Sequence, residues 1–230
     1  MQPVRTAAVI LAAGAGERFG SPTPKQFLEV AGAPVIAWSV RAFREAGIEP
    51  VAAVPPGWEG FCRERLGLET IVGGKSRTDT VRRVLVWLAR KGYTYSFLHA
   101  ATRPFLLPEL VRFLLEHIGD FAALVTAQEI TGGLVDRVAG RSLDRSRHRL
   151  ITSPELVAVG PLSEALARHP GDHTLAAEAL LLAGERVGYV ETGGLFFKIT
   201  YPEDLSVAER LLGNGAPLVR LAGPFPFTSA

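Results

Sequence analysis

The sequence predicts an α/β fold: a doubly wound, mainly parallel β-sheet of Rossmann-like type, with a β-arm projecting from it. Short apolar runs of strand length alternate with amphipathic segments of helix length along most of the 230 residues, which is typical of successive strand–helix–strand units. The first apolar run ends in a glycine-rich loop, and ligand-binding loops lie beyond the carboxyl ends of parallel strands. Hydrophobic residues make up 47% of the chain, enough for one large core, so we expect a single domain over residues 1–230.

The first part of the chain predicts alternating elements from its residue pattern. Each expected strand is a short apolar run, and each expected helix carries its apolar residues on one side, as Val35, Trp38 and Ala42 do. The segment TDTVRRVLVWLARK is strongly amphipathic in this sense. In order, we expect a strand at residues 7–11, a helix at 34–46, a strand at 51–54, a helix at 58–66, a strand at 70–72, a helix at 78–91, a strand at 96–101, a helix at 108–118 and a strand at 121–127.

The alternation breaks between about residues 128 and 155. Paired glycines, short alternating runs and five arginines in GGLVDRVAGRSLDRSRHRLITSP predict a β-ribbon arm in this region. Beyond the arm, we expect helices at residues 162–168, 175–183 and 202–212 and strands at residues 186–191 and 195–200. Pro202 at the start of the last helix fits, because proline is favoured in a first helical turn. The tail at residues 213–230 carries three prolines, and we expect it to be loose.

The stretch AAVILAAGAGERFGSPTPKQF, residues 7–27, carries the clearest functional signal. Glycines without a Cβ let backbone N–H groups approach an anion closely, and Gly14 and Gly16 stand directly after the first expected strand. Arg18 and Lys25 follow, and their charges can neutralise the anion. We interpret this stretch as a phosphate-binding loop, which predicts nucleotide chemistry.

Two common phosphate-binding motifs do not fit these glycines. A dinucleotide-binding fingerprint requires Gly or Ala at the position of Phe19. Residues 73–76, GGKS, resemble the end of a Walker A loop, but that loop requires glycine at the position of Glu69. The site is therefore of a different kind.

Composition excludes several other classes of protein. The formal net charge is +2 and no run of Lys and Arg reaches five residues, so the sequence predicts no nucleic-acid partner. Cys62 is the single cysteine, which excludes an intramolecular disulfide. We expect no secretory leader, and we find no apolar segment long enough to span a bilayer. We therefore expect a cytoplasmic protein with no membrane partner.

Six motifs in a fixed order resemble one family. They are Ala12-Ala13-Gly14-x-Gly16-x-Arg18, Pro24-Lys25-Gln26-Phe27, Gly73-Gly74-x-x-Arg77-x-Asp79-Thr80-Val81, His99-x-Ala101-x-Arg103-Pro104, Asp144-Arg145 and Lys198-Ile199-Thr200-x-Pro202-Glu203-Asp204-Leu205. Over about residues 6–212 the chain resembles the nucleotidyltransferases, and among them the 2-C-methyl-D-erythritol 4-phosphate cytidylyltransferases. These enzymes of non-mevalonate isoprenoid biosynthesis join CTP to a sugar-alcohol phosphate and release pyrophosphate.

The resemblance implies a role for each matching residue. Arg18 and Lys25 are the expected catalytic residues, because negative charge increases on the phosphate oxygens as one phosphate attacks the α-phosphorus of CTP. The residues expected to position the second substrate are Arg145, Lys198, Thr131 and Ser153, and those expected to bind the nucleotide are Ala12, Ala13, Gly14, Gly16, Gly73, Gly74 and Thr80. The family is homodimeric with crossing arms, so we expect Arg145 to act in the neighbouring subunit's site.

The sequence departs from the family pattern where the magnesium ligands are expected. The pattern H-D-A-A-R-P has Ala100 in place of its aspartate, and the pattern T-D-E/D-A has Leu175 in place of its first carboxylate. The pattern T-P-Q ends in Glu155 here. Protein-bound Mg²⁺ usually takes at least one carboxylate together with substrate phosphates. Mg²⁺ is the implied cofactor, and its protein ligands are unknown.

Three functions stay open at this point. The first is a cytidylyltransferase whose Mg²⁺ is held mainly by CTP phosphates and water. The second is another transferase of the same fold, such as a ribitol-phosphate cytidylyltransferase or a sugar-1-phosphate pyrophosphorylase, although the arm with Arg145 resembles the cytidylyltransferases specifically. The third is a dimeric nucleotide-binding protein without turnover, which the loss of both carboxylates would fit.

Overall fold

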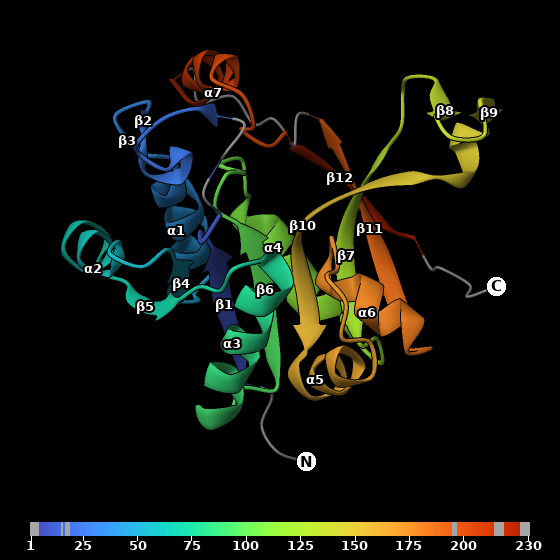
Figure 1. Ribbon diagram of the computed structural model, residues 1–230, viewed down its shortest axis with the longest axis horizontal. Helices are drawn as coiled ribbons and strands as arrows, with labels where there is room; N and C mark the ends of the chain where they lie inside the picture. The colour runs from blue at the N-terminus through green and yellow to red at the C-terminus, as the bar shows by residue number, and fades with distance from the viewer. Residues whose placement is uncertain (1–4, 15, 17–18, 195–196, 214–218, 226–230) are drawn as a thin grey trace.

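An eight-stranded β-sheet runs through the centre of the protein, in the strand order β12-β11-β7-β10-β6-β1-β4-β5 (Figure 1). The computed structural model describes residues 5–14, 16, 19–194, 197–213 and 219–225. The strands of the sheet are β1 (Thr6–Leu11), β4 (Pro50–Val54), β5 (Glu69–Val72), β6 (Tyr95–Ala100), β7 (Ala123–Glu129), β10 (Arg149–Ala158), β11 (Val187–Gly194) and β12 (Val219–Phe225). The helices are α1 (Val35–Glu45), α2 (Glu59–Leu66), α3 (Arg77–Arg90), α4 (Pro108–His117), α5 (Val159–Arg168), α6 (Ala176–Leu182) and α7 (Glu203–Gly213).

The sheet is mainly parallel, as predicted. Strand β1 pairs in parallel with both β4 and β6, and its last residue, Leu11, lies opposite Ala53 on one side and Ala100 on the other. Strand β10 is antiparallel to β6 and β7, and β12 is antiparallel to β11. The carboxyl ends of β1, β4, β5 and β6 therefore meet at one edge, where the predicted phosphate-binding loop begins.

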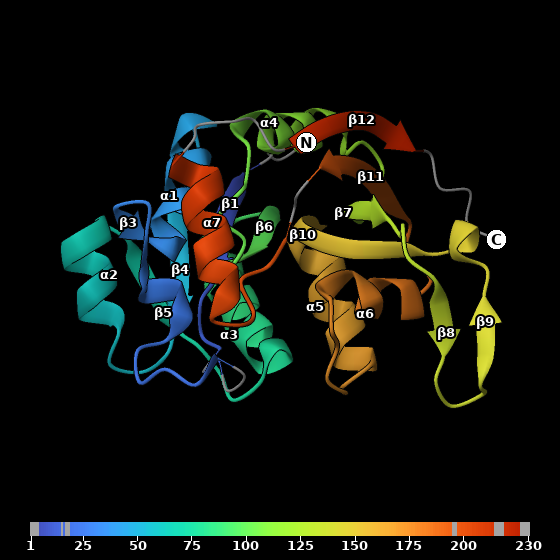
Figure 2. The same ribbon diagram turned by 90° about the horizontal axis from the view of Figure 1, so that it is seen from above.

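Helices cover both faces of the sheet (Figure 2). Alternate residues of each buried strand point to opposite faces. Val9, Leu98 and Val157 belong to the core under α3, α5 and α6, whereas their neighbours Ile10, Phe97 and Leu156 belong to the core under α1, α2 and α4. This arrangement confirms the doubly wound fold, and each predicted helix is present.

The arm leaves the sheet between β7 and β10 (Figures 1 and 2). Its two short strands, β8 (Leu134–Asp136) and β9 (Arg141–Leu143), pair with each other and with no other strand of the described residues. The projecting part is shorter than the predicted residues 128–155, because β10 pairs with β7 from Arg149 onward and has Thr152, Ser153 and Glu155 buried in the sheet.

Two predictions for the end of the chain need correction. Within the predicted strand at residues 195–200, the described residues 197–200 are not a strand: Phe197 and Ile199 pack against α7, but the backbone forms no ladder. The tail, predicted to be loose, contains β12, which pairs with the otherwise open edge of β11. Pro224 is compatible with this position, because an edge strand tolerates a missing N–H group.

None of the helices in the described ranges is long and apolar enough to cross a membrane.

Candidate active site

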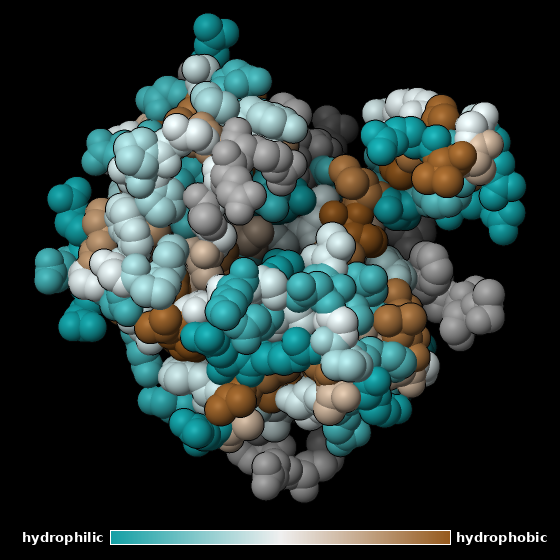
Figure 3. Space-filling view, viewed as in Figure 1, coloured by the Kyte–Doolittle hydropathy of each residue, from teal (hydrophilic) through white to brown (hydrophobic). Residues whose placement is uncertain are grey.

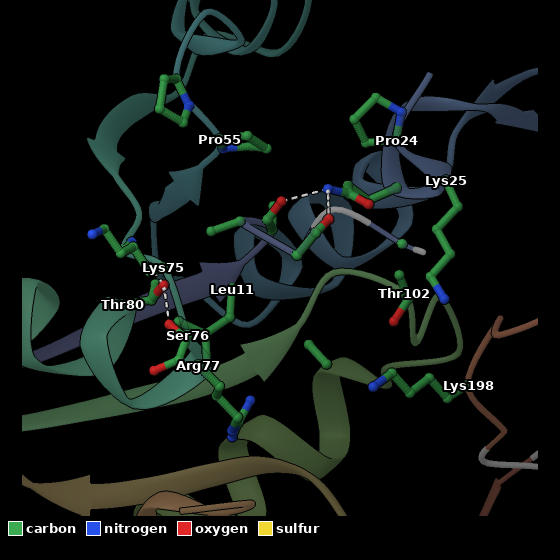
Figure 4. A pocket seen from close by; sticks show the side chains of 18 of the residues that line it. Leu11, Pro24, Lys25, Pro55, Lys75, Ser76, Arg77, Thr80, Thr102 and Lys198 are labelled. Carbon is green, nitrogen blue, oxygen red and sulfur yellow. Dashed lines mark hydrogen bonds between the residues drawn. The ribbon is translucent and has the colours of Figure 1, made fainter. Parts of the chain in front are cut away.

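A cavity of about 910 Å³ opens at the carboxyl ends of β1, β4, β5 and β6 (Figure 4). Its wall combines the loops that follow these four strands with one residue that precedes α7. The lining residues are Leu11, Ala12, Ala13, Gly14, Gly16, Pro22, Pro24, Lys25, Gln26, Pro55, Pro56, Gly74, Lys75, Ser76, Arg77, Thr80, Ala100, Thr102 and Lys198. Ligands of doubly wound sheets bind at this edge, so the cavity is the candidate active site.

The glycine-rich loop is fixed by Gln26, a residue of the motif at residues 24–27 to which the sequence pattern assigned no role. Gln26 is buried, and its Nε2 donates to the carbonyl oxygens of Ala12 and, at 3.2 Å, Gly14. Gly16 has a φ of +72°, a conformation that favours glycine. The described part of the loop is thus fixed in position at the wall of the cavity. Arg18, the other predicted catalytic residue, lies outside the described residues.

The loop after β5 forms the facing wall because two of its residues are glycines. A Cβ on Gly73 would lie 2.2 Å from the Cβ of Ala13, so glycine is required for the two loops to touch. A Cβ on Gly74 would lie 2.1 Å from an oxygen of Asp79. Thr80 Oγ1 accepts from the Gly74 N–H at 2.9 Å, which fixes the loop from inside. The predicted nucleotide-binding residues are therefore brought together.

Two predicted cations reach the cavity from one side (Figure 4). Lys25 is only 7% exposed, and its Nζ donates to the carbonyl oxygen of Thr200 at 3.4 Å. Lys198 enters from the segment before α7. A hydrogen bond from the Ile199 N–H to the Thr102 carbonyl oxygen, at 2.9 Å, attaches this segment to the loop that follows β6. This segment therefore brings Lys198 to the same cavity as Lys25.

Two further cations line the same cavity: Lys75, in the loop after β5, and Arg77, at the start of α3. Arg77 Nη2 donates to Oε1 of Glu155 at 2.6 Å. Neither Arg77 nor Glu155 was assigned a role from the sequence. Arg77 stood inside a recognised motif, and Glu155 replaced the family's glutamine, so the exchange to a charged residue was the available signal.

His99 lies behind the cavity wall in a neutral form. Its Nε2 is 3.0 Å from the Arg103 carbonyl oxygen, which can only accept, so Nε2 carries the proton. Its Nδ1 then accepts from the hydroxyl of Ser153, and Ser153 Oγ in turn accepts from the Ala100 N–H at 3.2 Å. Complete burial lowers the pKa of His99 to about 3. Such a histidine orders the end of β6 and is no general base at neutral pH.

Three of the predicted positioning residues lie away from the cavity lining. Ser153 is buried with its hydroxyl bonded as above, and it does not line the cavity. Arg145 and Thr131 are on the arm, both exposed, and Arg145 Nη1 donates to the Thr131 carbonyl oxygen. Within this one chain, the arm residues and the cavity are not brought together.

The residues present do not fit a protein-held Mg²⁺. Ala100 lines the cavity where the family pattern has a carboxylate, and Leu175 lies outside the cavity, at the N-cap of α6. Both oxygens of the nearby Glu155 are engaged by Arg77 and by the Ala177 N–H. Among the residues that the structure describes, no group of three or more His, Cys, Asp and Glu side chains could hold a metal ion.

The fold and the cavity together define a nucleotidyltransferase: a glycine-rich loop and a facing glycine loop at the carboxyl edge of the sheet, with lysines beside them. The family model for IspD, 2-C-methyl-D-erythritol 4-phosphate cytidylyltransferase, matches residues 6–214. The chain belongs to this family.

Individual relatives agree with the family match. Two proteins named 2-C-methyl-D-erythritol 4-phosphate cytidylyltransferase are similar to it: one from Cereibacter sphaeroides, 34% identical over 93% of this chain and 99% of its own length, and one from Deinococcus radiodurans, 36% identical over 91% and 90%. The crystal structure of the Thermus thermophilus protein of that name has a TM-score of 0.76 at 30% identity and covers 90% of this chain and 98% of that one.

Proposed function

We propose that this protein transfers the cytidylyl group of CTP to 2-C-methyl-D-erythritol 4-phosphate, with release of pyrophosphate, in non-mevalonate isoprenoid biosynthesis. The observation that carries the proposal is the cavity at the carboxyl edge of the sheet, in which two close-packed glycine loops face Lys25 and Lys198. The family membership supplies the identity of the two substrates.

The reaction needs positioning and positive charge more than acid–base catalysis. A phosphate oxygen of the sugar alcohol attacks the α-phosphorus, a new P–O bond forms, and the bond to the β-phosphate breaks as pyrophosphate leaves. Negative charge grows on the equatorial and leaving oxygens. In this proposal Lys25 and Arg18 neutralise that charge, and Lys198 holds the phosphate of the second substrate. The attacking group is already an anion, so a neutral His99 is compatible with the chemistry.

Mg²⁺ is part of the proposal as a companion of the nucleotide. In this chain it would enter with the phosphates of CTP, without a carboxylate from the cavity lining in the described ranges. Support comes from Ala100 and from the engaged oxygens of Glu155.

A homodimer assembled through the arm is the second part of the proposal. The arm is a two-stranded ribbon, which is marginally stable by itself in water. Val135 is 64% exposed and Val138 is 97% exposed, and apolar side chains are visible on the projecting arm in Figure 3. A second copy would cover these two valines and receive Arg145 and Thr131 in its own cavity. The proposed location of this dimer is the cytoplasm.

A dimer that binds nucleotides without turnover is the second candidate function. The observation that favours it is Ala100 at the cavity wall, where the family pattern has a carboxylate.

Pyrophosphate release decides between the candidates. It should be measured with CTP and the other nucleoside triphosphates, each paired with 2-C-methyl-D-erythritol 4-phosphate, ribitol phosphate or a sugar 1-phosphate, with and without Mg²⁺. Release only with CTP and 2-C-methyl-D-erythritol 4-phosphate is expected. Release with another pair would indicate a different transferase, and CTP binding without any release would indicate the silent dimer.

A further inference from the structure

An ion pair between residues of two different elements lies at the wall of the cavity, with Arg77 lining the cavity and Glu155 buried behind it. Arg77 begins α3, and Glu155 lies on β10 directly opposite Leu98 of β6. Glu155 therefore points to the sheet face that α3 covers, as Leu98 does. Ala100 lies two residues beyond Leu98 on that face, diagonally across from Glu155. A carboxylate thus stands beside the cavity one strand away from Ala100, and it faces a cation of the chain itself.

Glu155 is fitted to hold this cation. Its side chain is 0% exposed, Oε1 accepts from Arg77 at 2.6 Å, and Oε2 accepts from the Ala177 N–H at 2.9 Å. Burial raises the pKa of Glu155, while the charge of Arg77 acts in the opposite direction. Both oxygens act as acceptors here, which suits the ionised form. An unpaired carboxylate at this depth would be costly, so Arg77 cannot leave without a penalty.

Arg77, in contrast, is open to the cavity. Its side chain is 31% exposed and lines the cavity. Figure 4 shows it on the side opposite Lys25 and Lys198. Its buried Nε finds no hydrogen-bond partner among the described residues. Arg77 also directly follows residues 73–76, the loop that forms the nucleotide wall, so it lies on the nucleotide side of the cavity.

We propose that Arg77, held in place by Glu155, binds the triphosphate of the nucleotide from the side opposite Lys25 and Lys198. A guanidinium presents planar paired donors that match two phosphate oxygens, and an anchored one loses less conformational freedom on binding. Arg77 is then a ligand-contacting residue and Glu155 a positioning residue. The pair gives the cavity a fixed cation without a metal ligand in its wall. That the ligand is a nucleotide rests on the proposed function.

The test is calorimetric binding of three probes to the full chain in EDTA: CTP, cytidine and inorganic tripolyphosphate. Arg77→Gln alone would leave Glu155 buried and unpaired, so the main variant is Arg77→Gln combined with Glu155→Gln, a neutral pair that can hydrogen bond. Glu155→Gln alone keeps the guanidinium and removes its anchor. Arg90→Gln, at the exposed far end of α3, is the matched control for a lost positive charge. Circular dichroism checks the fold of each variant.

The double variant should bind CTP and tripolyphosphate about 10- to 100-fold more weakly, the size of a lost charged hydrogen bond, with cytidine binding unchanged. Glu155→Gln alone should give a smaller loss, and Arg90→Gln none. Wild-type affinity for CTP in the folded double variant, or an equal loss for cytidine, would overturn the proposal. Wild-type affinity in Glu155→Gln would overturn the positioning role. A wild-type protein that binds tripolyphosphate but not CTP would contradict the proposed function, whereas the Arg77 effect on tripolyphosphate would stand.

Discussion

Lys25 combines a catalytic role in the proposal with the packing of a core residue. It is 7% exposed, and its Nζ is 5.9 Å from the centre of the Phe19 ring. A loop lysine predicted from sequence would be expected to be solvated and replaceable. The structure shows instead that its aliphatic part fills space, so removing the side chain and removing the charge are different experiments.

Lys25→Met removes the charge and keeps most of the packing. Turnover should fall about 10²- to 10⁵-fold, the scale of a lost transition-state cation. In Arg18→Ala, turnover should be reduced by a factor in the same range. Steady-state pyrophosphate release measures the effect, and thermal unfolding shows whether Lys25→Met has kept the fold. A folded Lys25→Met protein with more than about a tenth of wild-type turnover would exclude the catalytic role.

His99 makes stability depend on pH. Its pKa falls from 6.5 in a free histidine to about 3 when it is buried in the fold. The unfolded chain therefore binds a proton first, and stability is lost as the pH falls through the window from 6.5 to 3. Between pH 7 and pH 5, protonation of His99 in the unfolded chain lowers the free energy of unfolding by about 2 kcal/mol.

Urea unfolding at pH 7 and pH 5 measures this loss. His99→Gln keeps a donor toward the Arg103 carbonyl oxygen but cannot take up a proton. The difference in the free energy of unfolding between pH 7 and pH 5 should therefore be about 2 kcal/mol smaller in this variant than in wild type. His148→Gln, which changes an exposed histidine on the arm, should leave the difference unchanged. An undiminished difference in His99→Gln would mean that other groups cause the acid sensitivity.

In the proposed homodimer, the arm is the element whose function depends on a second chain. Within one chain, Arg145 contacts Thr131 and lies away from the cavity lining. Exposed Val135 and Val138 on the same ribbon favour a partner. If the partner is a second copy, each complete site takes Lys25 from one subunit and Arg145 from the other.

Mixed dimers test this arrangement. Arg145→Ala and Lys25→Met proteins should each be inactive alone. When their subunits exchange, one of the two sites in each mixed dimer regains both intact residues. A mixed dimer should therefore recover up to about half of the activity of a wild-type dimer. Subunit exchange must be verified independently, by fluorescence energy transfer between labelled chains. Exchange without recovery would place Arg145 outside the partner's site.

For the whole molecule, local patterns predicted the sheet, the helices and the edge of the sheet at which the cavity lies. They did so because strand alternation and the glycine loop depend on neighbouring residues. The missed features depend on pairing between distant strands. Glu155 reaches Arg77 only because β10 inserts between β6 and β7, and β12 forms only where β11 leaves an open edge. Gln26 acts on carbonyl groups of a loop that folds back over it, which no local pattern shows.

If Mg²⁺ enters with the nucleotide as proposed, the charge balance of the whole cavity sets the Mg²⁺ requirement. Lys25, Lys75, Arg77 and Lys198 line the cavity, and no carboxylate of the described residues does. The cavity should therefore attract a triphosphate strongly and a divalent cation weakly. Ala100→Asp would restore one carboxylate in the lining. Leu175→Asp adds the same charge outside the cavity, at the N-cap of α6, where aspartate is well tolerated, and is the matched control.

Turnover is then measured against Mg²⁺ concentration for the three proteins. Wild type should need about 1 mM Mg²⁺, because in this proposal only phosphates and water hold the ion. Ala100→Asp should lower the half-saturating concentration at least about tenfold, equivalent to about 1.4 kcal/mol, and Leu175→Asp should not. CTP binding in EDTA should weaken in Ala100→Asp, since the new carboxylate repels the triphosphate. Wild-type saturation at micromolar Mg²⁺ would mean that the described cavity lining is not the metal's environment, and an unchanged requirement in Ala100→Asp would place the metal away from the end of β6.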